Sequence, residues 1–227
     1  NYWFQLIWLF TGGLALHLFA PKKQEIIMGK REIRWHFLSA FLLVIPYIVA
    51  AAFRNDLYGD TAVYRRTFFE APNSLSAMPE YLTTVTKDRG FAVLTVLLKS
   101  IIGNSDVVFF LIIAAFQMLC LALIYRKYSC NYWMSIFIFV AGTDYMSWCH
   151  NGMRQFLAIT VIMLALPLLL KRKYIPVILI ILLASTFHAS AILMLPVIFI
   201  VQGKAWNKKS VFCILGCILT LLLVDQF

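Results

Sequence analysis

Long apolar runs separated by short cationic loops restrict this chain to one class of fold. Residues 2–20, 35–53 and 107–125 are each close to the roughly 20 mostly apolar residues with which an α-helix crosses a bilayer. Hydrophobic residues make up 62% of the chain and charged residues 13%. In lipid, such runs form helices because each spanning element must satisfy its own backbone polar groups. The sequence therefore predicts an all-α, polytopic membrane protein.

The remaining apolar segments raise the expected number of membrane helices to about seven to eight. Residues 174–200 are interrupted near their middle by polar side chains, which predicts a hairpin of two short helices that turns at His188. Residues 90–103 are too short for a full crossing and predict a re-entrant or surface helix. One crossing each is predicted for residues 132–142, 156–170 and 211–224.

Most of the 20 Lys and Arg residues fall in short loops, as expected for a membrane protein whose cytoplasmic loops are cationic. The net charge of +10 therefore records orientation, and no nucleic-acid partner is predicted. We expect one transmembrane domain, 1–227, a fragment of a longer chain, with residues 54–105 as the main extracytoplasmic segment. A surface helix is expected to begin at Asp60 and Thr61. The cytoplasmic cations are expected in four places: loop 21–34, residues 126–127, residues 171–173, and Lys204 with Lys208 and Lys209.

One extracytoplasmic cation, Arg154, stands at the start of an apolar run. If Asn151 caps the helix that follows, Arg154 lies in its first turn, where free N–H groups already favour anions. Together with a guanidinium they form a site suited to phosphate or pyrophosphate. The alternative is an arginine that reaches lipid headgroups or pairs with a carboxylate such as Asp144.

Several short motifs on the extracytoplasmic side occur in a recognisable order. In that order the chain resembles the EpsG family, Wzy-like membrane proteins of bacterial exopolysaccharide and capsule clusters, over about residues 54–196. The motifs are Arg54, Gly59-Asp60-Thr61, Tyr64, Asp88 two residues before Gly90-Phe91, residues 151–158 (Asn-Gly-Met-Arg-Gln-Phe-Leu-Ala) and residues 187–191 (Phe-His-Ala-Ser-Ala).

The resemblance implies a polysaccharide polymerase, a glycosyltransferase that joins oligosaccharide repeat units carried on undecaprenyl pyrophosphate. It implies a multi-pass protein of the bacterial plasma (inner) membrane with an extracytoplasmic active face and no cofactor or metal. The expected partners are the lipid-linked oligosaccharide, the bilayer and other polysaccharide-export proteins. The four scattered histidines and five cysteines lack the spacing of a zinc site, which agrees with that expectation.

Two residues are candidates for catalysis. Arg154 suits stabilisation of the leaving pyrophosphate, and His188 suits the role of general base, for which imidazole is the usual group. The alternative for His188 is a core histidine, and for Asp60 a simple N-cap. The predicted substrate-binding residues are Arg54, Asp60, Tyr64, Asp88, Arg89, Asn151 and Gln155.

Two other functions remain open. A flippase for a lipid-linked saccharide would use the same arginines, but would also place polar residues along a path through the cytoplasmic half. A membrane acyltransferase that modifies polysaccharide would use histidine and arginine, and would need a path for a cytoplasmic acyl donor. The intramembrane polar residues of this sequence gather near one face, which favours an enzyme that acts on one side.

Overall fold

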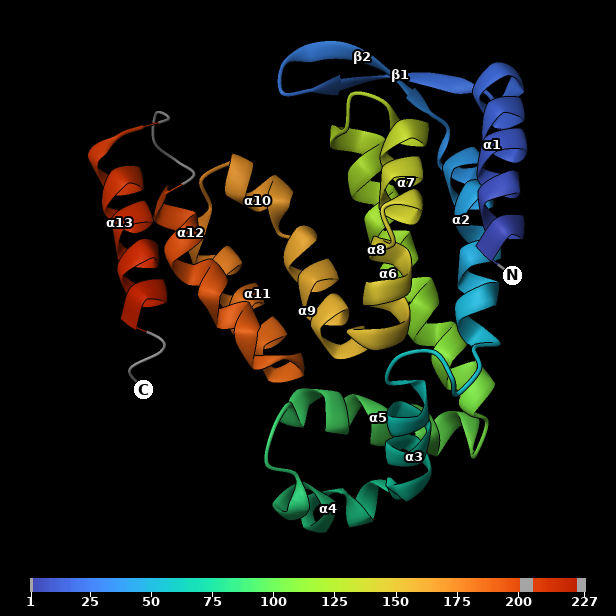
Figure 1. The fold of residues 1–227 in the computed structure, drawn as a ribbon, viewed down its shortest axis with the longest axis vertical. Helices are drawn as coiled ribbons and strands as arrows, with labels where there is room; N and C mark the ends of the chain where they lie inside the picture. The colour runs from blue at the N-terminus through green and yellow to red at the C-terminus, as the bar shows by residue number, and fades with distance from the viewer. Residues whose placement is uncertain (1, 201–205, 224–227) are drawn as a thin grey trace.

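The computed structural model describes residues 2–200 and 206–223, and these are predominantly helical (Figure 1). In chain order the elements are α1 (Tyr2–Phe19), β1 (Lys22–Ile27), β2 (Lys30–Trp35), α2 (Phe37–Ala52), α3 (Thr61–Glu70), η1 (Leu75–Ala77), α4 (Met78–Thr84), α5 (Arg89–Ile102), α6 (Asp106–Tyr128), α7 (Tyr132–Ala141), α8 (Asp144–Met146), η2 (Ser147–Asn151), α9 (Met153–Met163), α10 (Leu166–Leu170), α11 (Tyr174–Phe187), η3 (Ala189–Leu193), α12 (Met194–Ile200) and α13 (Lys208–Leu223).

Upright helices form the body of the molecule, and α2 and α6 pack extensively against each other in its right-hand half as drawn (Figure 1). Tyrosines tie these helices together, because each buried hydroxyl donates to a backbone carbonyl of a neighbouring element. Tyr47 donates to Gln5 at 2.7 Å, Tyr132 to Ala40 at 2.7 Å and Tyr145 to Tyr47 at 2.7 Å. A buried hydroxyl without such a partner is costly, so these bonds fix how the helices pack.

The predicted membrane helices are helical in the structure. Three helical stretches, Tyr2–Phe19, Asp106–Tyr128 and Met153–Leu170, are long and apolar enough to cross a bilayer. Phe37–Ala52, Tyr132–Ala141, Tyr174–Phe187 and Ala189–Ile198 are apolar but shorter. The protein is therefore a helical membrane protein, and the count of seven to eight crossings stays a prediction. Residue 224 of the last predicted crossing and Lys204 lie outside the described residues.

The hairpin predicted within residues 174–200 is confirmed. α11 ends at Phe187, and His188 has an extended backbone (φ −156°, ψ 122°) that breaks the helix. η3 then packs back against α11, and α12 continues the return (Figure 1). The turn leaves His188 at the lower end of the bundle as drawn, close to α5.

The expected loop 21–34 is wrong, because these residues form an antiparallel β-hairpin. Met28 and Gly29 at its turn both have positive φ, 50° and 80°, as two-residue hairpin turns require. The hairpin is anchored from one face, where the Glu25 carboxylate accepts a hydrogen bond from the Arg126 guanidinium at 2.8 Å. The many cations of this segment predicted a loop, but the segment is a paired β-hairpin.

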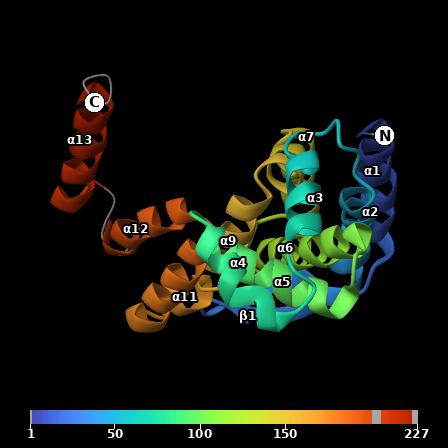
Figure 2. The same ribbon diagram turned by 90° about the horizontal axis from the view of Figure 1, so that it is seen from below.

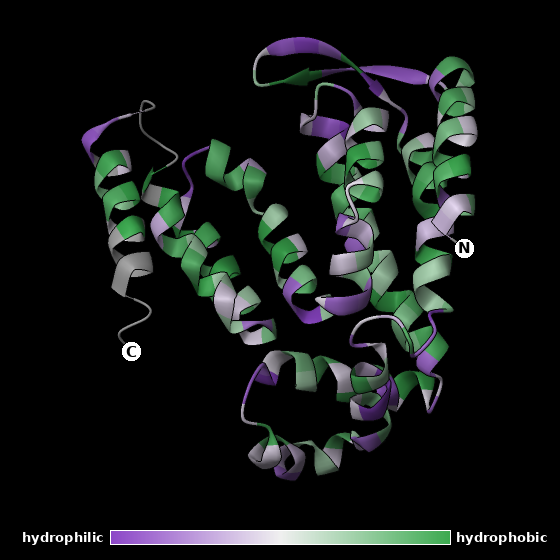
Figure 3. Ribbon diagram, in the orientation of Figure 1, coloured by the Kyte–Doolittle hydropathy of each residue, from purple (hydrophilic) through white to green (hydrophobic). Residues whose placement is uncertain are grey.

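Hydrophilic residues gather at both ends of the bundle, and the upright helices between them are mostly hydrophobic (Figure 3). The hairpin, the end of α6, the α10–α11 link and the start of α13 lie at one end, and they carry the cationic segments predicted to share a side. The group α3–α5, from within segment 54–105, lies at the other end, with α4 and α5 across the direction of the upright helices. Figure 2, seen from this end, shows the group in front of the bundle, with α12 and α13 to one side.

Within that group, α3 has the amphipathic face that the sequence predicts, with Tyr64 and Phe68 buried against α5 and α6. Lys99 of α5 is 3% exposed, and its ammonium donates to the carbonyls of Phe69 at 2.7 Å and Ala71 at 2.5 Å. A cation at a helix C-terminus is favoured by the helix dipole. Lys99 therefore ties α5 to the end of α3.

Replacing Lys99 by methionine is expected to lower the free energy of unfolding by about 1–3 kcal/mol, because one buried and one partly buried carbonyl lose their charged donor. Thermal and denaturant unfolding in detergent micelles measures the change. Lys87→Met, at an exposed position in the same group, is the matched control and is expected to have little effect. Equal stability of the two variants would show that the Lys99 contacts contribute nothing.

Candidate functional site

Asp88 joins three elements that are far apart in the sequence. Its Oδ2 lies 3.0 Å from Nη1 of Arg154 and 3.4 Å from Nδ1 of His188. Its other carboxylate oxygen accepts a hydrogen bond from the backbone N–H of Ala189 at 3.3 Å. The link before α5, the first turn of α9 and the turn after α11 therefore meet at one carboxylate. We call Asp88, Arg154 and His188 the carboxylate cluster.

Local backbone geometry explains how Asp88 reaches this position. Asp88 has left-handed φ and ψ of 54° and 44°, which aspartate tolerates better than most residues. Two residues later, Gly90 lies so close to α11 that an added Cβ would stand 2.6 Å from the Thr186 Cβ and 2.9 Å from the Thr186 carbonyl carbon. The Gly90-Phe91 pair recognised in the sequence is thus the point where α5 crosses the end of α11.

Gly90→Ala is expected to lower the free energy of unfolding by about 1–3 kcal/mol, since the backbone of α11 cannot yield as a flexible side chain would. Unfolding in detergent measures the loss. Ser100→Ala, at an exposed position of the same helix, should stay within about 0.5 kcal/mol of wild type. A Gly90→Ala protein as stable as Ser100→Ala would contradict the close helix crossing.

The expected cap at Asn151 is wrong. Residues Ser147–Asn151 form a π-helical turn, and Gly152 occupies the N-cap position of α9. The Gly152 N–H donates to the Ser147 carbonyl at 2.8 Å, so the wider turn moves the helix start one residue along. Arg154 still lies in the first turn of α9, as predicted.

Several contacts hold the start of α9 in place. The Tyr64 hydroxyl donates to the Asn151 carbonyl at 2.9 Å, and the Arg154 guanidinium lies 5.7 Å from the centre of the Tyr64 ring. The loop that contains Gly59 (φ 52°) packs closely against the same residue. A Cβ added at Gly59 would stand 2.9 Å from the Asn151 Cβ. Gln117, which sequence reasoning missed, is fully buried in α6, and its Nε2 donates to the Met153 carbonyl at 2.9 Å. Its only sequence signal is an amide within an apolar run.

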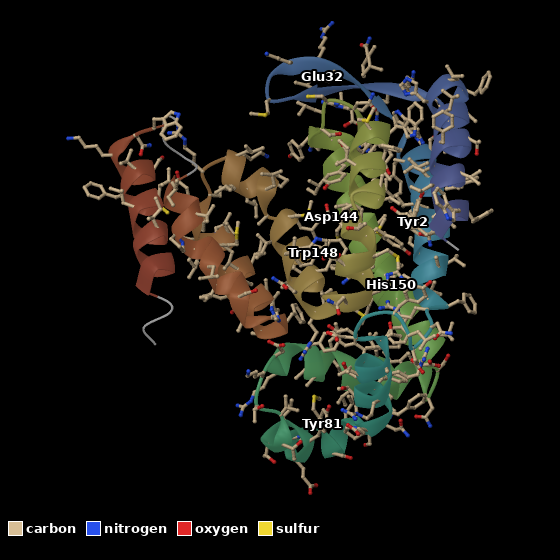
Figure 4. All side chains as sticks on the ribbon, in the orientation of Figure 1. Tyr2, Glu32, Tyr81, Asp144, Trp148 and His150 are labelled. Carbon is tan, nitrogen blue, oxygen red and sulfur yellow. The ribbon has the colours of Figure 1, made fainter. Side chains whose placement is uncertain are left out.

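Exposure separates the roles within the carboxylate cluster. The Asp88 side chain is 7% exposed, whereas the side chains of Arg154 and His188 are 39% and 31% exposed. The carboxylate is therefore shielded, and the cation and the imidazole remain accessible. The observed partner of Arg154 is Asp88, not the Asp144 considered from the sequence, which lies farther up the bundle than His150 (Figure 4).

The contact with Asp88 sets which ring nitrogen of His188 is available. With Nδ1 facing the carboxylate, the favoured tautomer carries its proton on Nδ1, since an ionised carboxylate accepts hydrogen bonds and cannot donate them. Nε2 is then the nitrogen with a free lone pair. This is the arrangement of an imidazole that is oriented by an acid and takes a proton at its far side.

The other predicted substrate-binding residues are placed outside this cluster. Arg54 is 4% exposed, and its guanidinium donates to the carbonyls of Ala51 at 2.6 Å and Cys149 at 2.7 Å, so its contacts are structural. Asp60 precedes α3 without a side-chain capping bond. Arg89 is exposed and donates to the Val85 carbonyl at 3.2 Å. Gln155 follows Arg154 in α9 and is half-buried.

A second histidine of the π-helical turn, His150, is 4% exposed beside the rings of Tyr58 and Tyr145. Burial lowers the pKa of His150 from its ordinary 6.5 to about 4, the Arg54 charge adds to this, and a backbone hydrogen bond to Tyr145 opposes it. The folded protein therefore keeps His150 neutral at pH 7. Neutral His150 is a packing group at the end of the bundle (Figure 4).

This lowered pKa predicts acid sensitivity. The unfolded chain takes up a proton near pH 6.5 and the folded chain only near pH 4, so stability is fully present above about pH 6.5 and falls as pH drops towards 4. Melting temperatures in detergent between pH 7.5 and pH 4 should fall less steeply for His150→Phe, which cannot take up this proton. Parallel pH dependences for the two proteins would exclude His150 as the cause.

The comparisons with known proteins bear on the whole region that builds the cluster. The sequence profile of the EpsG family matches residues 37–227, a range that includes Asp88, Arg154 and His188. No curated protein and no solved structure matches the chain. The match covers well over half of the sequence and confirms the resemblance predicted from the motifs. The chain belongs to the EpsG family.

Proposed function

We propose that this membrane protein is a polysaccharide polymerase of the Wzy-like type. It joins oligosaccharide repeat units carried on undecaprenyl pyrophosphate at the extracytoplasmic face of the bacterial plasma membrane, for exopolysaccharide or capsule. Membership of the EpsG family supports a polysaccharide-related role. The observation that carries the proposal is the carboxylate cluster, in which one buried acid holds an accessible guanidinium and an accessible imidazole together.

In the proposed reaction, an acceptor hydroxyl oxygen attacks the anomeric carbon of the donor sugar. The hydroxyl proton passes to Nε2 of His188, whose other nitrogen faces Asp88. The bond between the anomeric carbon and the pyrophosphate oxygen breaks, and its electron pair leaves with the lipid pyrophosphate. A single displacement of this kind inverts the configuration at the anomeric carbon. Asp88 acts through His188 and Arg154 and is therefore a positioning residue.

Arg154 suits the leaving group, because negative charge grows on the pyrophosphate as the bond breaks. One edge of its guanidinium faces Asp88 at 3.0 Å, and the side chain is 39% exposed. A guanidinium has five N–H donors, so it can hold the carboxylate on one edge and phosphate oxygens on another. The start of α9 adds to the field that favours an anion there, because the peptide dipoles of a helix make its N-terminus positive.

The experiment that tests the function uses the purified protein in liposomes and a lipid-pyrophosphate repeat unit, in the presence of a chelator. A polymerase gives a ladder of products in which each step adds one repeat unit. Transfer of the labelled lipid between leaflets without any ladder would favour a flippase and overturn the proposal. Products with a single added acyl group after supply of an acyl donor would favour the acyltransferase.

A further inference from the structure

A cavity of about 300 Å³ lies among α6, α9, α10, α11 and α12, and almost all of the atoms that line it are apolar. Ile159 and Ile162 of α9 and Val177 and Ile181 of α11 form its walls. Met194, which is 38% exposed at the start of α12, stands at its edge. Water gains little in such a space because it finds no polar partners, so an apolar occupant is favoured.

The two helices that wall the cavity also carry the carboxylate cluster. At 1.5 Å per residue, Ile159 and Ile162 lie about 7.5 and 12 Å along α9 from Arg154. Ile181 and Val177 lie about 10 and 16 Å along α11 from His188. The cavity therefore begins one to two helical turns from the cluster and extends along α9 and α11 away from it.

We infer that this cavity binds the isoprenoid tail of the lipid-linked donor while its pyrophosphate lies at Arg154. The inference rests on the proposed function and adds to it a site for the lipid. A guanidinium at one end of a helix pair and an apolar cavity farther along the same pair match a ligand with an anionic head and a hydrocarbon tail. Between the two, α9 and α11 pack against each other through the small residues Ala158 and Ala184, both of which are buried.

The reach of the cavity distinguishes a polyprenyl tail from a phospholipid chain of the same leaflet. The hydrocarbon core of a bilayer is about 30 Å thick, so one leaflet spans about 15 Å. The wall at Val177 is at about that depth from His188, and the lining continues past it to Ala165 and Leu169. A chain that runs from the cluster to this far wall is therefore at least about as long as one leaflet is thick, a length that a polyprenyl chain exceeds.

The test is photolabelling of the full protein in nanodiscs with a polyprenyl pyrophosphate that carries a diazirine group in its tail. Label is expected on peptides of α9, α11 and α12. Unlabelled polyprenyl pyrophosphate should compete for the label, and phosphatidylglycerol should not. Ile181→Trp, which fills the cavity, should reduce labelling about tenfold or more, because about two excluded methylene groups account for that factor. Leu179→Trp, 61% exposed on the same helix and outside the lining, is the matched control.

Label elsewhere on the protein would overturn the tail site. Equal competition by phosphatidylglycerol would also overturn it, because the cavity would then bind ordinary phospholipid. The competition arm uses the wild-type protein, so the test holds even if Ile181→Trp does not fold. Labelling needs no acceptor and no glycosyl transfer. A protein that makes ladders without label in the cavity refutes the tail site alone, whereas a labelled protein that makes no ladder refutes the polymerase alone.

Discussion

His188→Ala is expected to lower the rate of polymer formation by about 10²–10⁴-fold, the loss that follows removal of a general base. The effect should fall on kcat, with KM for the lipid-linked donor little changed, because the role proposed for His188 is to take the acceptor proton and not to hold the pyrophosphate. Free imidazole in the buffer should restore part of the rate of His188→Ala. The measurement is single-turnover conversion of a labelled repeat unit.

Matched variants separate chemistry from structure. His36→Ala removes an exposed histidine at the opposite end of the bundle and should leave the rate unchanged. Asp88→Asn should also lower kcat, because the amide no longer fixes the imidazole tautomer, but imidazole should not restore it. If His188→Ala retained the wild-type rate, or if imidazole rescued both variants equally, His188 would not be the base.

The membrane class, the apolar helices, the turn at His188 and the start of α3 could be predicted from the sequence, since each follows from local hydropathy or helix-start signals. The hairpin β1–β2 could not, because its cations suggested a loop and its pairing depends on a turn at Met28 and Gly29. The helix start at Met153 was displaced by a π-helical turn, which leaves no sequence signature.

The candidate site, too, could be predicted only in part from the sequence. His188, Arg154 and Asp88 were predicted from motifs, but their contacts were not. The contact between Asp88 and His188 joins residues 100 positions apart and depends on how α5 crosses α11. Asp88 was predicted to bind substrate, and the structure places it between the other two members of the carboxylate cluster. Arg54 was also predicted to bind substrate. In the structure it is buried, its guanidinium lies 4.2 Å from the centre of the Phe110 ring, and its hydrogen bonds to carbonyls fix the end of α2 instead.

Arg154→Gln is expected to lower the rate by about 10²–10³-fold, the loss seen when a donor that stabilises developing charge is removed. Arg154→Lys should recover part of this, because a lysine keeps the charge but not the planar set of donors. Arg66→Gln is the control, since Arg66 is 73% exposed and its nearest acid, Glu70, is 3.8 Å away. The measurement is the same single-turnover assay.

Loss of Arg154 also leaves the shielded Asp88 carboxylate without its cation, and such a charge can disturb the site by itself. The double variant Arg154→Gln with Asp88→Asn removes both charges and separates the two causes. If Arg154 stabilises the leaving pyrophosphate, the double variant should be as slow as Arg154→Gln or slower. The contrary outcome has two parts: Asp88→Asn alone has nearly the wild-type rate, and the double variant has a rate close to that of Asp88→Asn. Arg154 would then serve only to neutralise Asp88. The phosphate role would then pass to another cation at the same end of the bundle, such as the exposed Lys87 or Arg89 on either side of Asp88 in the sequence.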